Sequence, residues 1–286
     1  MLFRSTLDVF GFSRGAAGAR NFIHEALLGE NSVKDQLTAK NYKVSRVDMN
    51  FAGLYDTVSS HGVRFSDDTK ALKLDAVLHA KAVLHLVAAE EHRENFSLTD
   101  IKSAGNKREI YLPGVHSDVG GSYNDGAKEE HTVFEASGYE LSAARSDRAQ
   151  LIAAGWYWET EIEMRLEDSG DTVSAEVKVH REKIHNHYSR IPLHIMARAA
   201  RENGIVFTDM FDKDQEVPAE LTKARQEIEA YVNGPQSKQS KAEHWHHNED
   251  WLRTLRNQYL HFSAKYEFGL NPRFKDGKRW RQTYDG

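Results

Sequence analysis

The sequence contains no cysteine, no long apolar run and no excess of positive charge. Each of these absences excludes a class of function or structure. With no cysteine among 286 residues, disulfides and a thiol nucleophile are both excluded. No apolar run approaches the roughly 20 residues of a membrane-spanning helix. Positive charge is not in excess, since 38 lysines and arginines face 43 aspartates and glutamates, so there is no electrostatic case for nucleic-acid binding. A chain of this length buries one large core, or one core with an appendage.

Phosphate-binding motifs are also missing from the most glycine-rich stretch, LDVFGFSRGAAGAR at residues 7–20. No Lys-Ser or Lys-Thr follows Gly15 or Gly18, as a Walker loop would require. Ser13 stands where the second glycine of a G-x-G-x-x-G loop would admit a pyrophosphate. The stretch instead fits G-x-S-x-G, in which Gly11 and Gly15 flank Ser13.

This G-x-S-x-G pattern is typical of a nucleophile elbow, the sharp strand-to-helix turn of α/β-hydrolases. Apolar residues precede it, and a helix-forming run over residues 16–28 follows it. Ser13 would then stand exposed at the bend, while Gly11 and Gly15 would let the strand and the helix approach closely. The simpler alternative is a Gly/Ser turn inside an ordinary α/β unit.

A serine nucleophile needs a base and an orienting carboxylate, and in α/β-hydrolases these follow in the order Ser, Asp or Glu, His. Asp56 is the first carboxylate after the apolar run MNFAGLY, although an aspartate there also commonly caps a turn. His116 lies in an irregular loop after EIYLPGV, and its alternative role is structural, because the chain has 15 histidines. Asp118 is a rival orienting acid or a loop hydrogen-bond acceptor. His261, on an expected apolar helix face, is the reserve base.

Hydrophobic periodicity divides the chain into two parts. The first part alternates strands and helices, which indicates a parallel sheet, with strands expected at 7–10, 49–55 and 109–112 and helices at 16–28 and 75–94. The second part is expected to contain a hairpin from 159–166 and 172–179, helices at 192–202, 219–232 and 249–265, and a polar loop at 234–241. We therefore expect an α/β-hydrolase catalytic core over residues 1–130 and a hairpin-and-helix region over residues 131–286 packed on it.

Two clusters of ring side chains each allow two interpretations. His244, His246 and His247 suggest a metal site, but neighbouring histidines cannot all face one ion, and no carboxylate lies at an established ligand spacing. We therefore expect no metal, no cofactor, and a solvated segment anchored by Trp245. The aromatic run at 156–158 is more typical of a core than of a lipid-contacting surface, although Trp and Tyr also favour the membrane–water boundary.

Several longer stretches resemble a known family. GFSRGA, LYDTV, AAEEHRENF and LPGVHSDVGGSY occur in this order within residues 7–124, and YLHFSA follows near the C-terminus. Together they resemble bacterial α/β-hydrolases that include antibacterial phospholipase effectors of type VI secretion systems; residues from about 130 to 250 match only loosely. The resemblance implies that Ser13 is the nucleophile, Asp56 the orienting acid and His116 the general base, and that the backbone N–H of Arg14 donates to the oxyanion.

The same resemblance implies a function and a location. It implies a serine hydrolase that cleaves acyl esters of membrane phospholipids, of phospholipase A type, and acts as a secreted antibacterial toxin. A secretion spike protein and a cognate immunity protein are the implied partners, and the periplasm of a target cell is the implied place of action. No signal-peptide pattern is recognised, so we expect synthesis in the cytoplasm. The alternative is a non-catalytic remnant, or a binding or scaffold module derived from such a hydrolase.

The sequence departs from the family at its N-terminus. The family has strands before the elbow, whose loop supplies a second oxyanion donor, and a motif close to FDGT; neither is recognised here. We therefore expect an α/β-hydrolase-like, mainly parallel sheet that is incomplete at its N-terminus, with a mixed hairpin-and-helix C-terminal region. Losing one oxyanion donor costs roughly 100- to 1,000-fold in rate, so impaired activity and an exposed, poorly soluble sheet edge are expected of a truncated chain.

Overall fold

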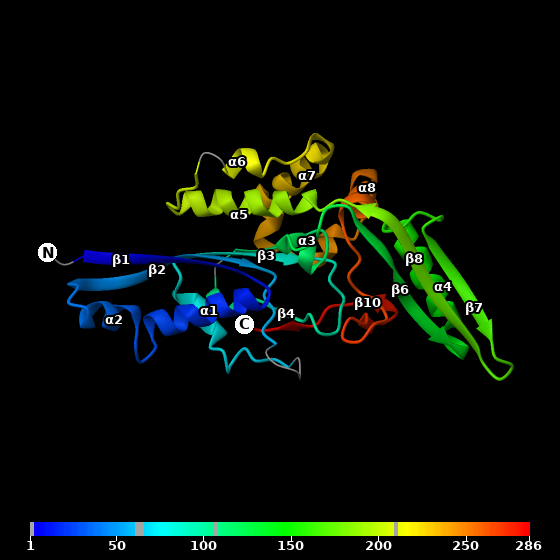
Figure 1. Cartoon of the computed structure of the whole chain (residues 1–286), viewed down its shortest axis with the longest axis horizontal. Helices are drawn as coiled ribbons and strands as arrows, with labels where there is room; N and C mark the ends of the chain where they lie inside the picture. Colours follow the sequence, from blue (N-terminus) through cyan, green and yellow to red (C-terminus); the bar gives the residue numbers. More distant parts are fainter. Residues whose placement is uncertain (1–2, 61–65, 106–107, 209–210) are drawn as a thin grey trace.

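A four-stranded parallel sheet forms the centre of the structure, a computed structural model that describes residues 3–60, 66–105, 108–208 and 211–286 (Figure 1). Its strand order follows the order of the chain, β1-β2-β3-β5, and every neighbouring pair is parallel. All four strands therefore end at the same edge of the sheet, where ligands bind in open α/β folds. The strands are β1 (Phe3–Phe12), β2 (Val44–Tyr55), β3 (Ala82–Ala88) and β5 (Arg108–Leu112).

Helices cover both faces of this sheet. On one face α1 (Arg14–Leu27) and α2 (Val33–Ala39) pack against β1 and β2, while α5 (Arg190–Glu202) packs on β2 and β3 from the other face, with α6 (Phe211–Asp214) and α7 (Thr222–Asn233) beyond it (Figure 1). Two separate apolar clusters, one on each face, account for the continuous apolar runs of β2 and β3, because a strand buried on both faces has no polar side.

The helix predicted over residues 75–94 is wrong. This segment forms a short 3-10 turn, η1 (Leu74–His79), and then the buried strand β3. The apolar spacing of three and four that suggested a helix arises because β3 is apolar on both faces, so it shows no alternation. Val83 and Val87 are β-branched and favour the strand. The strands expected at 7–10, 49–55 and 109–112 lie within β1, β2 and β5.

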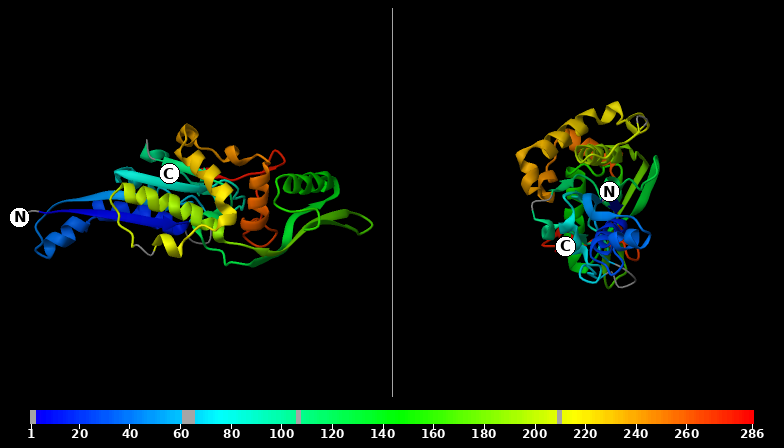
Figure 2. Two further views of the ribbon diagram at one scale, coloured as in Figure 1. Left: turned by 90° about the horizontal axis from the view of Figure 1, so that it is seen from above. Right: turned by 90° about the vertical axis from the view of Figure 1, so that its left-hand side faces the viewer.

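The predicted hairpin is confirmed, and it belongs to a second, antiparallel sheet of order β6-β8-β7. Helix α4 packs on all three of its strands, and Figure 2 shows this sheet and β1 at opposite ends of an elongated molecule. The hairpin therefore does not extend the parallel sheet, where β1 pairs only with β2 among the described residues. The elements are β6 (Ala127–Ser137), α4 (Leu141–Ala153), β7 (Ile162–Asp168) and β8 (Val173–Ile184). The domain boundary expected after residue 130 falls inside β6 and stays a prediction.

The C-terminal segment returns to the parallel sheet after α8 (Asp250–Tyr259). This helix ends earlier than predicted, so the expectation that His261 lies on a helix face is wrong; Leu260 is already extended. Near the end of the chain β11 pairs in parallel with β4, which brings the C-terminus beside the first half of the fold (Figure 1). The remaining elements are β4 (Leu98–Thr99), β9 (Phe274–Lys275), β10 (Lys278–Arg279), β11 (Thr283–Tyr284), α3 (His116–Gly120), η2 (Lys102–Ala104), η3 (Gly138–Glu140), η4 (His187–Ser189), η5 (Ala219–Leu221), η6 (Pro235–Gln239) and η7 (Ala242–Trp245).

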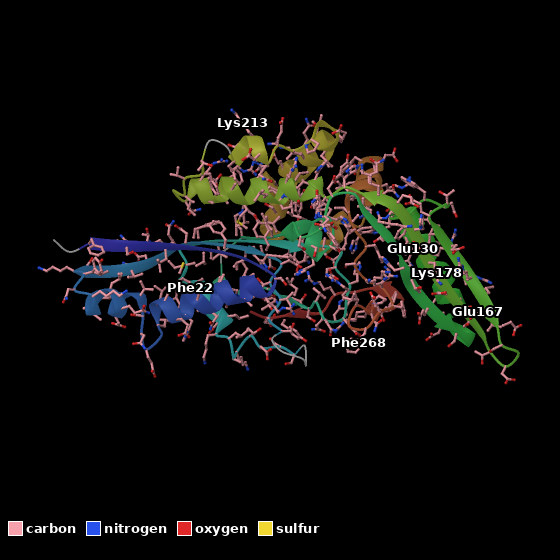
Figure 3. The ribbon with its side chains drawn as sticks, in the orientation of Figure 1. Phe22, Glu130, Glu167, Lys178, Lys213 and Phe268 are labelled. Atoms are coloured by element: carbon pink, nitrogen blue, oxygen red, sulfur yellow. The ribbon has the colours of Figure 1, made fainter. Side chains whose placement is uncertain are left out.

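The aromatic side chains divide between the core and the surface. Trp156 and Tyr157 are buried as expected, but Trp158 is exposed, so the core prediction is wrong for Trp158. Trp245 is buried, and its indole N–H donates to the Tyr111 carbonyl at 2.8 Å. Phe268 is 99% exposed and projects at the edge of the molecule in Figure 3. No helix in the described part of the chain combines the length and apolar character needed to cross a bilayer.

Candidate active site

The three residues of the predicted triad follow three different strands of the parallel sheet. Ser13 directly follows β1, Asp56 directly follows β2, and His116 begins α3 shortly after β5. Because the carboxyl ends of parallel strands meet at one edge, residues far apart in the sequence converge there (Figure 1). The alternation of strand and helix in the sequence is what makes this convergence predictable.

The turn at Ser13 has the backbone of a nucleophile elbow. Ser13 has φ 60° and ψ −127°, a conformation that a non-glycine residue rarely adopts, and it precedes the first residue of α1. Its N–H donates to the Tyr55 carbonyl at 2.9 Å, and its own carbonyl accepts from Val58 N at 3.3 Å. These bonds fix the strained turn directly beside Asp56. Strain that the surrounding structure holds in place is typical of functional turns.

The two glycines of the motif do not have equal roles. A Cβ at Gly11 would lie 2.3 Å from the Gly15 carbonyl oxygen and 2.7 Å from Ala16 Cα, so only glycine lets the strand and helix approach here. A Cβ at Gly15 would meet no atom within 4 Å. The expectation that both glycines serve the close approach is therefore wrong for Gly15. Arg14 is the first residue of α1, and the first N–H groups of a helix have no intrahelical partner.

Asp56 and His116 form a buried pair. His116 Nδ1 lies 2.5 Å from Asp56 Oδ2, and both residues are at most 3% exposed. The imidazole lies against the rings of Phe12 and Phe96, with ring centroids 4.5 and 5.1 Å away. Phe12 precedes Ser13, so this packing brings the histidine beside the elbow. Within the described residues Ser13 Oγ and His116 Nε2 form no hydrogen bond; catalytic contacts of this kind often tighten only when substrate binds.

Arg281 completes this pair, and sequence analysis did not identify it. Its guanidinium donates from Nη1 to Asp56 Oδ1 at 2.7 Å and from Nη2 to Asp56 Oδ2 at 2.8 Å. The Ala88 N–H also donates to Asp56 Oδ1, at 2.9 Å. Arg281 lies 225 positions after Asp56, in a stretch with no motif of its own. No local signal in one sequence predicts such a pairing.

The charge state of Asp56 follows from these neighbours. Burial alone would raise the pKa of Asp56, but the charges and hydrogen bonds of Arg281 and His116 outweigh burial and hold this pKa well below its usual range. An ionised carboxylate only accepts hydrogen bonds, so His116 Nδ1 must be the donor. The other ring nitrogen, Nε2, is then free to accept a proton.

A second buried carboxylate, Glu91, fixes the backbone of the histidine. Glu91 Oε2 accepts from the His116 N–H at 3.3 Å. Arg93 donates to both oxygens of Glu91, at 2.9 and 2.8 Å, and Ser263 Oγ donates to the same carboxylate. Burial raises the pKa of Glu91, but Arg93 above all lowers it, to about 2. This ionised carboxylate therefore restrains the turn that carries His116.

The rival pair, Asp118 and His261, forms separately. His261 Nδ1 lies 2.8 Å from Asp118 Oδ1, and the N–H groups of His261 and Val115 both donate to Asp118 Oδ2 at 3.1 Å. Tyr123 stacks on the His261 ring with centroids 3.6 Å apart. His261 Nε2 is buried and finds no hydrogen-bond partner among the described residues. Asp118 thus accepts loop hydrogen bonds, one of the two roles expected for it, and orients a different histidine from His116.

A cavity of about 420 Å³ is lined by neighbours of the triad residues, though not by Ser13, Asp56 or His116 themselves. Its aromatic wall includes Phe12, whose ring packs on His116, and Tyr55, which precedes Asp56. The lining residues after Tyr55 come from α3, α5 and the segments next to α3, α5 and α6. The lining consists of Phe10, Gly11, Phe12, Tyr55, Val119, Gly120, Gly121, Ser189, Leu193 and Gln215. Most of its larger side chains are apolar.

Part of this chain matches the model of a known protein family. Residues 25–142 match the family model described as "T6SS, Phospholipase effector Tle1-like, catalytic domain". The predicted family resemblance is confirmed. The matched stretch contains Asp56 and His116 and begins after Ser13. A search of curated proteins gave no match.

One solved structure supports the same fold. The structure titled "Structure of the Tle1 effector bound to the VgrG spike from the Type 6 secretion system" matches with a TM-score of 0.70 and 22% identity, over 100% of this chain and 68% of that chain. An uncharacterized protein from Pseudomonas aeruginosa matches with a TM-score of 0.42 and 18% identity, over 84% of this chain and 30% of that chain. The Tle1-like match and the parallel sheet agree with the expected α/β-hydrolase-like fold.

Proposed function

We propose that this Tle1-like chain is a serine esterase that hydrolyses acyl esters of membrane phospholipids. One observation carries the proposal. The buried pair of Asp56 and His116 lies at the carboxyl edge of a parallel sheet, beside the strained turn that presents Ser13. A nucleophile, a base and an acid that orients the base are the requirements of acyl transfer through a serine ester.

The chemistry follows from the hydrogen bonds of the pair. Ser13 Oγ attacks the acyl carbonyl carbon while His116 Nε2 accepts the hydroxyl proton. Asp56, held ionised by Arg281, accepts from Nδ1–H and stabilises the imidazolium that forms. The Arg14 N–H, at the start of α1, donates to the oxyanion. His116 then protonates the departing lysophospholipid oxygen, and water hydrolyses the acyl-serine to release a fatty acid.

The apolar cavity supports a lipid as the substrate. A fatty acyl chain gains roughly 0.8 kcal/mol for each CH₂ group that it buries, and the cavity offers phenylalanine, valine and leucine side chains next to the pair. The triad alone would serve peptides, simple esters or lipids equally well. The choice of a phospholipid therefore rests on this cavity together with the family match.

Delivery and location form part of the proposal. The Tle1 effector is bound to a VgrG spike in its structure, and we propose a spike of this kind as the carrier of this chain. Hydrolysis of membrane phospholipids in the periplasm of a rival cell would make it an antibacterial toxin, with a cognate immunity protein in the producing cell. Neither partner is needed for the chemistry at Ser13.

The test is hydrolysis of vesicles of phosphatidylethanolamine and phosphatidylglycerol. We expect wild-type protein to release free fatty acid and lysophospholipid, and Ser13→Ala to release neither while keeping the same folded circular dichroism spectrum. Ser5→Ala, which changes a serine in β1 away from the turn, is the matched control and should keep full activity. Release of a phosphorylated head group, or activity that survives Ser13→Ala, would contradict the proposal. A folded protein without any hydrolysis would favour the scaffold alternative.

A further inference from the structure

A cluster of metal-ligating side chains lies outside the triad, at the turn between β8 and α5. Asp125, His185 and His187 each offer one ligand atom, and these three atoms lie within 4.8 Å of one another. His185 directly follows β8 and His187 begins η4, whereas Asp125 comes from the loop between α3 and β6. Two loops that are distant in the sequence therefore supply the three groups.

The distances within the cluster suit a small metal ion. Asp125 Oδ1 lies 3.0 Å from His185 Nδ1 and 3.8 Å from His187 Nε2. Ligands bound to zinc at about 2.0–2.2 Å in a tetrahedral arrangement are about 3.4 Å apart, between the two observed distances. An ion would replace the ring proton of His185 that now faces the carboxylate. Side chains that are 29–45% exposed leave a further position open to water.

Hydrogen bonds of the backbone and of the Asn186 and Asp125 side chains hold the two loops in place independently of any ion. Asn186, between the two histidines, donates from its side chain to the Tyr123 carbonyl at 2.8 Å. Its N–H donates to Asp125 Oδ1 at 3.3 Å. The Gly126 N–H donates to the Ile184 carbonyl at 2.9 Å, and the His185 N–H donates to the Gln258 carbonyl at 2.9 Å. The three ligand groups are therefore brought together by their backbones before a metal binds.

We propose that Asp125, His185 and His187 form a binding site for a divalent transition-metal ion of the zinc class. Two imidazoles and one carboxylate are a ligand set that zinc, nickel and copper accept and that calcium and magnesium, which prefer oxygen ligands, do not. The ion joins the loop that follows α3 to the turn that precedes α5. Both segments border the cavity of the proposed lipid site, through Gly121 and Ser189.

Metal binding is tested first, and separately from hydrolysis. Metal-free protein is titrated with ZnCl₂ by calorimetry, and with CoCl₂ while the visible spectrum of tetrahedral cobalt is recorded. We expect one equivalent of each ion to bind, a tetrahedral cobalt spectrum, and a higher melting temperature with zinc. Asp125→Ala and His187→Ala should each weaken zinc binding at least tenfold and abolish the cobalt spectrum. These results do not depend on whether the protein hydrolyses lipids.

His180→Ala is the matched control. His180 is an exposed histidine beside carboxylates, with Nε2 2.6 Å from Glu182 and Nδ1 3.8 Å from Glu130, but in the described part of the chain no second imidazole completes a ligand set there. This variant should bind zinc with unchanged affinity. Wild-type protein without stoichiometric binding overturns the proposal. So does wild-type affinity in the double variant Asp125→Ala/His187→Ala, because the ion would then be bound elsewhere, as at His244–His247.

Discussion

Two buried Asp–His pairs in this molecule differ in what contacts the carboxylate. The Nδ1–carboxylate distances are 2.5 Å for His116 with Asp56 and 2.8 Å for His261 with Asp118. Asp56 receives a bidentate guanidinium from Arg281, whereas Asp118 receives backbone N–H groups and no cation among the described residues. The strained serine turn is hydrogen-bonded to Tyr55 and Val58, on either side of Asp56 in the first pair.

The difference appears in the direction of the pKa shifts of the two acids. Burial acts to raise the pKa of both. For Asp118 burial outweighs the hydrogen bonds from His261 and Val115, so its pKa is raised, while Arg281 and His116 reverse the effect of burial for Asp56. An acid that stays ionised fixes its histidine as an Nδ1 donor and a base at Nε2. A close Asp–His contact is therefore not sufficient evidence for a catalytic pair.

The largest expected effect comes from removing each histidine in turn. We predict that His116→Ala lowers kcat/KM for phospholipid by about a thousand-fold or more, since triad members act as a unit. His261→Ala should stay within about tenfold of the wild type, because its partner is not the acid beside Ser13. The measurement is fatty-acid release at matched folded concentrations. The opposite ranking of the two variants would transfer the base role to His261.

We expect the next largest effect on turnover from replacing Arg281, and this effect depends on pH. In Arg281→Gln the burial of Asp56 is no longer offset by the guanidinium, so the pKa of Asp56 rises. We predict a kcat roughly 10- to 100-fold lower at pH 8, because the Asp56–His116 pair is held less firmly. We also predict that the acid limb of the pH–rate profile moves to higher pH. A profile with an unmoved acid limb would show that Arg281 has only a structural role.

The free energy of unfolding also depends on the pKa of Asp56. Because the folded pKa of Asp56 is depressed, its stabilising contribution is present above the unfolded value of about 3.9 and is lost as pH falls below it. In Arg281→Gln the higher folded pKa makes this contribution smaller, so the variant should be less stable than the wild type at neutral pH. Denaturant midpoints measured from pH 8 down to pH 3 should show the largest difference at neutral pH and curves that converge as the pH falls.

We expect the smallest effects from alanine substitutions at the two glycines of the elbow, and these two variants are closely matched. Gly11→Ala places a Cβ 2.3 Å from a backbone oxygen, so we predict a stability loss of about 1–3 kcal/mol and lower turnover. Gly15→Ala has open space, and alanine favours a helix over glycine by up to about 1 kcal/mol. Urea midpoints of the two variants check this directly. Equal losses in both would mean that the elbow is not closed at Gly11.

The sequence predicted the parts of the site that depend on chain order. Ser13, Asp56 and His116 each follow an apolar strand, and parallel strands end at one edge, so their convergence needed only the order of elements. Arg281 and Glu91 were missed because their contacts join distant segments without a local motif. The strand β3 was mistaken for a helix, because a strand buried on both faces lacks the alternation that identifies one. The metal ligands were missed for a similar reason: Asp125 and His185 meet only through the fold.

The most direct test of the central claim is covalent labelling with a fluorophosphonate, which reacts with activated serines. Wild-type protein is treated with the probe, digested and mapped by mass spectrometry. We predict one adduct, on Ser13, that His116→Ala abolishes and His261→Ala retains. An adduct on a different serine, or labelling of Ser13 that requires His261 and not His116, would contradict the assignment of the triad.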